Sequence, residues 1–317
     1  MAENGVRQWL VTDADAGQRL DNFLLRVMKG VPRSHIYKIL RSGEVRVNKG
    51  RARPHYHIAE GDVLRLPPVR VAAPGDPAVL PAHLRSQLEA AVLFEDSHLL
   101  VLDKPSGLAV HGGSGLSWGI IEALRQLRPD ARELELVHRL DRETSGCLIL
   151  SKKRSALRAL HESLRQGQME KHYLALACGD WKGPARSVRL PLRKNTLQSG
   201  ERMVRVDPVA GKEAHTHFSA REHFSGATLV EADLDTGRTH QIRVHLQAIA
   251  HAVAGDEKYG DPAFNQRLRA LGLRRLFLHA ASIRFAHPRD QQPMHIQAPL
   301  PAELEAVLQQ LRQESCL

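Results

Sequence analysis

An arginine and an aspartate separated by one residue, Arg139 and Asp141, stand in a polar loop between two apolar segments. Residues 134–137 precede the loop and residues 147–150 follow it, so the pattern predicts strand, loop and strand, with Asp141 at the mouth of the loop. Loops held by rigid elements commonly present functional groups. An ionised carboxylate there could act as a nucleophile or a base. An aspartate between strands can equally hydrogen-bond its own turn, and its position alone leaves both roles open.

Metal chemistry finds little support in the spacing of ligand residues. The 18 histidines are a high count, but they form no His-Glu-x-x-His or similar cluster. His240 and His245 are five residues apart, which places them on different faces of a helix. The three cysteines, Cys147, Cys178 and Cys316, are too few and too scattered for a disulfide framework or a cysteine zinc site. We therefore predict no metal, and expect most histidines to lie at the surface.

Cofactor and glycosidase chemistry are equally weakly indicated. The glycine-rich segment 111–115 lacks the Gly-Lys-Ser/Thr ending of a phosphate-binding loop, and no Gly-x-Gly-x-x-Gly follows a predicted strand. Asp141 and Glu143 could form a carboxylate pair across a glycosidic bond, but only their proximity in sequence supports it. We predict no cofactor.

The net charge is concentrated near the N-terminus. Residues 17–70 carry 12 Lys and Arg against 4 Asp and Glu, which accounts for +8 of the chain's +10. Such a block is typical of a module that binds a polyanion, most plausibly nucleic acid. A solvated surface with chance lysines and arginines would not explain the concentration.

Elements predicted within this block place basic residues between apolar ones. Leu20, Phe23 and Leu24 recur at helical spacing and predict a first helix. Ile36 and Ile39 do the same in a second helix, which starts at residue 33 or 34 and ends at residue 43. Strands are predicted at residues 45–47 and 63–66. The segment 34–48, with its Gly-x-Val-x-Val-Asn ending, resembles the small alpha-L RNA-binding domain of ribosomal protein S-four. The candidate RNA contacts in this block are Arg33, His35, Lys38, Arg41, Arg46 and Asn48.

Three parts are predicted along the chain. The S-four-like domain spans residues 17–71, a proline- and alanine-rich linker spans 72–83, and a larger domain spans 84–317. We expect an α+β fold, with a mixed, mainly antiparallel sheet and peripheral helices in the larger domain. A strand at residues 171–177 carries Tyr173. Arg243 falls in the first turns of a helix for which Thr239 is the expected N-cap, next to the positive end of its dipole.

Several motifs of the larger domain occur together in a recognisable order. The sequence His138-Arg139-Leu140-Asp141, followed by Thr144-Ser145-Gly146, resembles the signature of the RluA-type pseudouridine synthases. Segments 103–107, 171–173 and 237–245 are similar to the other motifs of that family. Asp103 stands where Asn is also common in the family.

The resemblance implies a reaction and residue roles. A uridine in ribosomal RNA would lose its N-glycosidic bond, and carbon-5 of the turned uracil would rejoin the ribose, without cofactor or metal. Asp141 would be the catalytic carboxylate, Arg243 the cation that keeps it ionised, and Tyr173 the platform for a base taken out of its helix. Arg139 would lie beside the vacated position and substitute for the extruded base.

The partner, the oligomeric state and the location of the protein can also be predicted. The partner implied by the resemblance is large-subunit ribosomal RNA or its assembly intermediates. No apolar run approaches the length of a membrane span, so we expect no membrane association. We also expect a monomer that acts in the cytoplasm.

Overall fold

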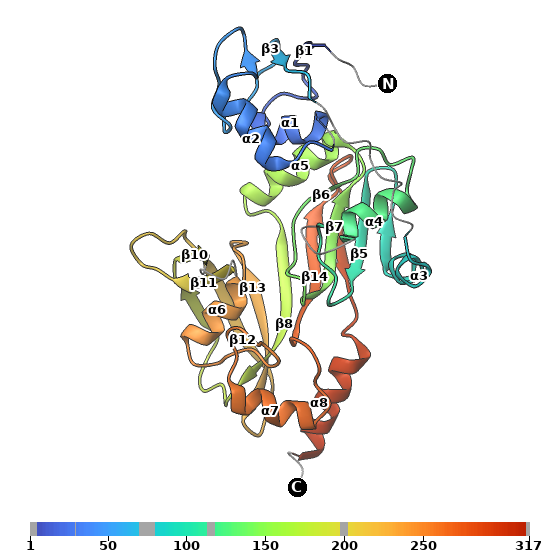
Figure 1. Ribbon diagram of the computed structural model, residues 1–317. Helices are drawn as coiled ribbons and strands as arrows, with labels where there is room; N and C mark the ends of the chain where they lie inside the picture. The colour runs from blue at the N-terminus through green and yellow to red at the C-terminus, as the bar shows by residue number, and fades with distance from the viewer. Residues whose placement is uncertain (1–4, 29, 70–79, 113–117, 197–201, 315–317) are drawn as a thin grey trace. The chain divides into compact units, whose positions relative to one another are not determined.

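The chain forms two compact units, Met1–Val79 and Leu80–Leu317 (Figure 1). The computed structural model describes residues 5–28, 30–69, 80–112, 118–196 and 202–314. None of the helices in these ranges is long and apolar enough to cross a membrane.

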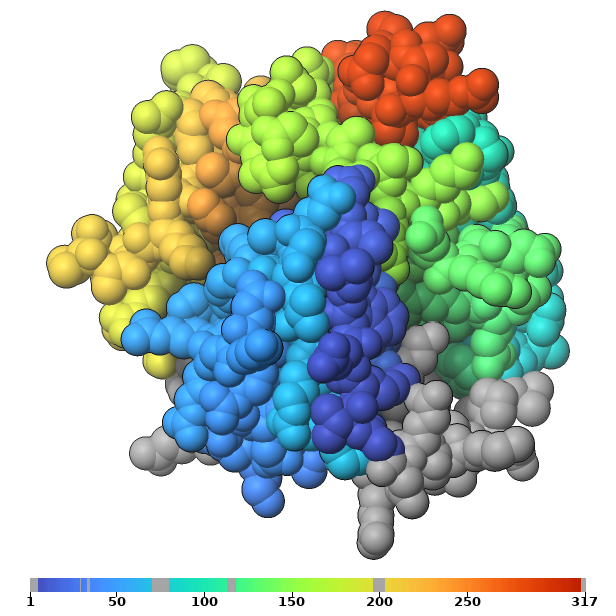
Figure 2. Space-filling model, turned by 90° about the horizontal axis from the view of Figure 1, so that it is seen from above, coloured from blue at the N-terminus to red at the C-terminus, as the bar shows by residue number. Residues whose placement is uncertain are grey.

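The N-terminal unit, blue in Figures 1 and 2, packs two helices against a small sheet. Its strands are antiparallel in the order β1-β3-β2. Leu20, Phe23 and Ile36 are fully buried between the layers, as the helical spacing predicts. The second helix ends at Gly43, whose left-handed backbone (φ 75°) closes the helix. The elements are β1 (Arg7–Leu10), α1 (Leu20–Val27), α2 (Arg33–Ser42), β2 (Arg46–Val47) and β3 (Val63–Leu66).

The bounds of the two units differ from the predicted domain bounds. Strand β1 pairs with β3, so the N-terminal unit includes residues before position 17. Most of the predicted linker falls on residues 70–79, outside the described ranges. The part that is described is no linker, because Leu80 is buried and helix α3 begins at Ala82.

The second unit is organised around one ten-stranded mixed sheet. Its main path runs β4-β5-β7-β14-β8-β13-β12-β9, with β6 paired to β7 and β15 paired to β14. The pair β7–β14 is parallel and the other pairs are antiparallel, which confirms the predicted α+β class. The strands are β4 (Val92–Glu95), β5 (Leu99–Lys104), β6 (Glu135–Leu136), β7 (Ser145–Ser151), β8 (Glu170–Cys178), β9 (Arg186–Arg189), β12 (His215–Phe224), β13 (Ala227–Leu234), β14 (Leu278–Ala286) and β15 (Pro293–Gln297). A separate hairpin consists of β10 (Leu192–Thr196) and β11 (Arg202–Val206).

Helices cover both faces of the sheet, which explains the unbroken apolar run in β7. Leu148 and Leu150 join the core beneath α3, α4 and α6, whereas Cys147 and Ile149 join the core beneath α5. A strand buried on both faces reads as continuous rather than alternating apolar sequence. Figure 1 shows α7 and α8 together near the C-terminus, where they share a further core. The helices are α3 (Ala82–Ala90), α4 (Ile120–Leu127), α5 (Arg154–Arg165), α6 (Gln241–Ala248), α7 (Pro262–Ala270) and α8 (Ala302–Glu314).

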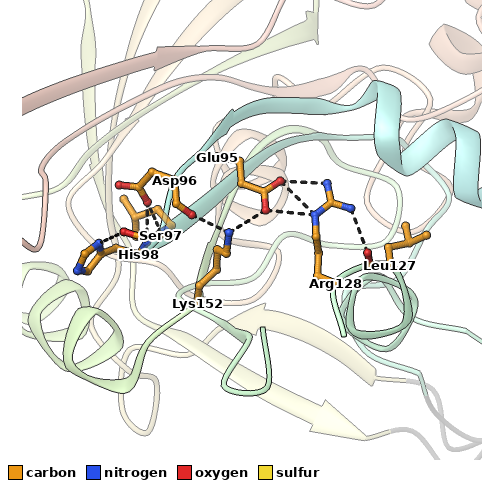
Figure 3. Close-up of polar contacts among 8 residues, drawn as sticks. Glu95, Asp96, Ser97, His98, Leu127, Arg128 and Lys152 are labelled. Atoms are coloured by element: carbon orange, nitrogen blue, oxygen red, sulfur yellow. Dashed lines mark hydrogen bonds and ion pairs between the residues drawn. The ribbon is translucent and has the colours of Figure 1, made fainter. Parts of the chain in front are cut away.

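A polar network ties the β4–β5 turn to its surroundings (Figure 3). The Glu95 carboxylate accepts hydrogen bonds of 3.0–3.1 Å from the Arg128 guanidinium. Lys152 donates to Glu95 Oε1 at 2.9 Å and to the Asp96 carbonyl at 2.6 Å. Asp96 in turn caps the backbone N–H groups of His98 and Leu99. The network holds the end of α4 and the end of β7 at the same turn.

Five of the 18 histidines are buried, which the expectation of surface histidines did not include. Of the others, eight are exposed and five are half-buried. Those in the core have partners for their ring nitrogens: His279 lies between Ser145 Oγ and the Ala298 carbonyl, and His245 lies between Thr216 Oγ1 and the Leu190 carbonyl. Burial is tolerated because the polar atoms are hydrogen-bonded.

Candidate active site

Asp141, Tyr173, Arg243 and Arg139 line one pocket of the second unit, although they are far apart in sequence. The pocket opens on the sheet face covered by α6, where Leu140, Tyr173 and Ile242 belong to the same apolar core. Sequence reasoning named these four polar residues, and the fold brings them together.

The loop that carries Asp141 is held tightly where it enters β7. The N–H of Thr144 donates to the Asp141 carbonyl at 3.2 Å, forming the turn. Gly146 follows with φ 107°, and a Cβ atom there would lie 2.3 Å from the Ala280 carbonyl oxygen of β14. Only glycine fits this position, because the two parallel strands approach each other without room for a side chain.

A buried lysine fastens the loop from the other side. Lys104 is fully buried, and its Nζ donates to the carbonyls of Pro105, Leu108 and Arg142 at 2.8–2.9 Å. Burial lowers the pKa of Lys104 to about 7, while the charges of Glu143 and Asp141 favour its protonated form. An ammonium has three N–H donors for the three carbonyls. Lys104 therefore links the segment 105–108 to Arg142, the residue that follows Asp141.

Replacing Lys104 by Met removes this tie while keeping a long unbranched side chain. Three carbonyls lose a donor, and each buried unsatisfied acceptor costs about 1–3 kcal/mol. We expect the free energy of unfolding to fall by at least about 2–3 kcal/mol in urea titration. Lys152→Met, which removes the partly exposed ammonium of Figure 3, is the matched control and should cost about 1 kcal/mol. Equal losses in the two variants would contradict the proposed tie.

His138 also supports the loop, through a hydrogen bond to β7. Its Nε2 accepts a hydrogen bond from the Ile149 N–H at 3.1 Å. Burial lowers the pKa of His138 to about 4, so the ring is neutral at physiological pH and can accept that bond. The histidine anchors the segment 138–141 to β7.

Arg243 faces Asp141 from the first turns of α6. Its Nη1 lies 3.6 Å from Asp141 Oδ2. On its other side the guanidinium makes two bonds to Asp256, Nε to Oδ2 at 2.6 Å and Nη2 to Oδ1 at 2.8 Å. Burial alone would raise the pKa of Asp256, but the hydrogen bonds and charge of Arg243 outweigh it and lower that pKa. Asp256 thus fixes the plane of the guanidinium and leaves Nη1 for Asp141.

His240 also lies beside Asp141, and it connects the carboxylate to Tyr259. His240 Nε2 lies 3.8 Å from Asp141 Oδ2, and its Nδ1 lies 2.8 Å from the Tyr259 hydroxyl. That hydroxyl accepts the Val204 N–H at 2.8 Å, and the Tyr259 ring lies under the Arg243 guanidinium at 4.9 Å. Burial lowers the pKa of His240, so the ring is neutral and carries one proton. A proton on Nε2 faces the carboxylate, whereas one on Nδ1 would turn a lone pair toward it.

The start of α6 differs from the sequence prediction. The N-cap is His240, not Thr239, and its backbone is left-handed (φ 55°). The Gln241 side chain instead accepts the Arg238 N–H and donates to the His215 carbonyl. A non-glycine residue in this conformation is unusual and is held by its surroundings; here it places the His240 ring beside Asp141.

Tyr173 lies on β8 between β13 and β14, with 7% of its surface exposed. Burial and the nearby Asp141 raise the pKa of its hydroxyl, which therefore stays protonated. Because the ring lines the pocket, it can present a flat face to a planar ligand. Glu143, the other half of the considered carboxylate pair, pairs instead with Arg142.

The candidate RNA contacts differ in their surroundings. Arg139 is exposed at the pocket, and His35, Lys38 and Arg41 are exposed on α2. Arg46 is half-buried on β2 and Arg33 begins α2. Asn48 has φ 51°, donates to Asp62 Oδ1 at 2.7 Å and accepts the Val63 N–H at 2.8 Å. Its amide is engaged within the protein, which favours a role in the turn.

Asp256, His240 and Tyr259 were not singled out as site residues from the sequence. His240 stands within a recognised motif, but its spacing to other residues gave no chemical role. Asp256 and Tyr259 lie in the stretch 255–260, whose closeness to Asp141 depends on the packing of α6 against the hairpin β10–β11. No local pattern signals that closeness.

Comparison with known proteins identifies two families in the chain. Residues 98–248 match the RNA pseudouridylate synthase family, and residues 18–64 match the S4 domain. Human RNA pseudouridylate synthase domain containing 4 superposes with a TM-score of 0.60 at 26% identity, covering 73% of this chain and 96% of that protein.

Similarity to curated relatives extends over nearly the whole chain. The ribosomal large subunit pseudouridine synthase C of Pasteurella multocida (strain Pm70) is 56% identical over 310 residues, which are 98% of this chain and 95% of the relative. The protein of the same name from Escherichia coli (strain K12) is 56% identical over 306 residues, 95% of each chain. With an S4 domain followed by the matching catalytic domain, this chain belongs to the RNA pseudouridylate synthase family.

Proposed function

We propose that this protein converts specific uridines of large-subunit (23S) ribosomal RNA to pseudouridine, with Asp141 as the catalytic carboxylate acting on a flipped-out uridine. The observation that carries the proposal is Asp141 at a pocket wall, with Arg243 at 3.6 Å and Tyr173 in the same lining. The substrate is inferred from the names of relatives that are more than half identical.

The reaction is an isomerisation, so atoms balance without a co-reactant. The bond from ribose carbon-1′ to uracil N1 breaks, the uracil turns, and a bond from carbon-1′ to carbon-5 forms. Carbon-5 then loses its proton, and N1 gains one. Asp141 can attack the sugar, attack the base or remove a ribose proton, and each of these requires an ionised carboxylate. The Arg243 guanidinium faces the Asp141 carboxylate at 3.6 Å and can pair with its charge.

The other residues suit a flipped base. Tyr173 offers a ring on which uracil can stack, and Arg139 can fill the space that the base leaves in the RNA. The N-terminal unit supplies exposed cations for phosphates. We further propose that the protein acts as a monomer in the cytoplasm.

The decisive test maps pseudouridines in large-subunit ribosomal RNA from cells with and without this protein. We expect a small set of positions to lose pseudouridine in its absence and to regain it when purified protein is added. The RNA strands should stay intact and no free uracil should appear. Strand cleavage or released uracil would instead indicate a nuclease or a glycosidase, and unchanged positions would remove the proposed substrate.

Tyr173 substitutions separate the ring from the hydroxyl. Base–aromatic stacking contributes about 1–3 kcal/mol, so Tyr173→Leu should weaken RNA binding about 5- to 150-fold and lose most activity. Tyr173→Phe keeps the ring and should bind RNA normally. It should turn over slowly if the hydroxyl serves a late proton transfer, which single-turnover kinetics would detect. Full turnover by both variants would leave Tyr173 with a packing role only.

The salt dependence of binding tests the N-terminal unit. Lys38 and Arg41 are exposed on α2, and each lost phosphate contact lowers the slope of log K against log salt by about 0.7–0.9. We expect the full-length double variant Lys38→Gln/Arg41→Gln to reduce the slope by about 1.5. A matched pair of exposed arginines in the second unit, Arg165→Gln/Arg269→Gln, should leave it unchanged. Equal slopes in both double variants would show that α2 does not contact phosphates.

A further inference from the structure

Two histidines and an aspartate converge outside the lining of the active-site pocket. His215 and His217 alternate along β12, so their side chains lie on one face of the sheet. Asp235 follows β13, the neighbouring strand. Its Oδ2 lies 2.5 Å from His215 Nδ1 and 3.1 Å from His217 Nε2, and the two rings are 4.2 Å apart.

The three side chains offer a ligand set of familiar chemistry. Both imidazoles lie within hydrogen-bonding distance of the same Asp235 oxygen. Without a cation, both imidazoles must turn an N–H toward one oxygen. A metal ion can replace those protons, because a neutral imidazole ligates through the nitrogen lone pair.

We propose that His215, His217 and Asp235 bind one divalent transition-metal ion, with zinc as the best fit. Two imidazole nitrogens and one carboxylate oxygen leave a fourth position for water, a combination that tetrahedral zinc accepts. Their potential ligand atoms all lie within 4.8 Å of one another. Ligand atoms around tetrahedral zinc are separated by about 3.3 Å, so the His217–Asp235 spacing already fits, and the His215–Asp235 spacing must open by less than about 1 Å.

Further hydrogen bonds to the ring and the backbone of His215 support this assignment. Ser187 Oγ lies 2.7 Å from His215 Nε2, so the ring can bind a metal through Nδ1 while its other nitrogen donates to the hydroxyl. The backbone of His215 is also fixed, since its N–H donates to Thr236 Oγ1 and its carbonyl accepts from Gln241. His217 and Asp235 are exposed and leave an entry path. A bound ion would tie β12 to the segment 235–241, which continues into the pocket lining.

A neighbouring group, His172 with Glu231 and Asp233, has similar ligands but is less suited. Glu231 is already paired with the Arg221 guanidinium, which would compete with a cation for the carboxylate. It therefore serves as an internal comparison for the test.

The test measures zinc uptake by the full-length protein without an affinity tag, in competition with a chromophoric chelator. We expect one tight equivalent in the wild type. His217→Ala and Asp235→Asn should each weaken that equivalent at least 10-fold, and Ser187→Ala should weaken it about 10-fold. His223→Ala, an exposed histidine of the same strand, is the matched control and should bind zinc as the wild type does. Cobalt(II) at the site should give the visible absorption of a tetrahedral ion, absent in His217→Ala.

Three outcomes would overturn the proposal. The first is no tight equivalent in the wild type, which would mean that the two histidines share Asp235 through protons alone. The second is an equivalent that survives His217→Ala. The third is an equivalent that is lost in Asp233→Asn instead, which would assign it to the neighbouring group. Circular dichroism of each variant verifies that the fold is intact, and no arm of the test depends on pseudouridine formation.

Discussion

Asp141→Asn is expected to abolish pseudouridine formation while leaving folding and RNA affinity nearly unchanged. The amide keeps the size of the side chain but removes the charge that Arg243 and His240 face at 3.6 and 3.8 Å. A positioned acid–base group contributes about 10²–10⁴-fold to rate. A group that is also a nucleophile contributes more, so we expect single-turnover rates to fall at least about 10³-fold.

Glu143→Gln provides the matched control for this result. It makes the same chemical change two residues away on the same loop, at a half-exposed side chain that pairs with Arg142. It should retain most activity. Turnover by a verified Asp141→Asn preparation within 10-fold of the wild type would remove Asp141 from the catalytic role.

Asp256→Asn should be the most destabilising single change at the site. The side chain of Asp256 is fully buried and holds Arg243 by two hydrogen bonds. Removing one partner of a buried ion pair costs about 3–5 kcal/mol, and Asp141, at 3.6 Å from Arg243, compensates the remaining charge only in part. We expect that loss in the free energy of unfolding, measured by denaturant titration. Activity should fall as well, because Arg243 loses the bond that orients it toward Asp141.

Asp261→Asn is the control for Asp256. Asp261 caps α7 by accepting the Phe264 N–H, and Asn is an equally good N-cap residue, so stability should change by only a few tenths of a kcal/mol. Adding Arg243→Met to Asp256→Asn removes the buried guanidinium that has lost its Asp256 partner. The double variant should recover part of the stability but none of the activity. A double variant that loses the sum of both single effects would show that the pair does not act as a unit.

Much of the architecture could be predicted from local pattern. Helical spacing of Leu20, Phe23 and Ile36 predicted the core of the N-terminal unit, because an amphipathic helix must bury its apolar stripe. Gly43 predicted the end of α2, since a left-handed closing residue favours glycine.

Local pattern was less informative where a side chain is satisfied by distant groups. The histidines were expected mainly at the surface. His279 and His245, however, are core residues whose partners lie on other strands and loops. The cap of α6 was misplaced for the same reason, because Gln241 bonds β12 and the preceding loop rather than a neighbouring turn. Hydrogen-bond satisfaction is a property of three-dimensional neighbours, which spacing along the chain does not encode.

The candidate site divides in the same way. The sequence by itself determined which residue types stood in motif positions: Asp141, Tyr173 and Arg243. Only the tertiary structure decided that they meet at one pocket, since β7, β8 and α6 are joined through a sheet whose order departs from chain order. It also supplied Asp256 and Tyr259, which contact Arg243 and His240 and which no sequence pattern singled out. The physical reason is that a buried charge needs partners from every side, and those partners come from wherever the chain folds back.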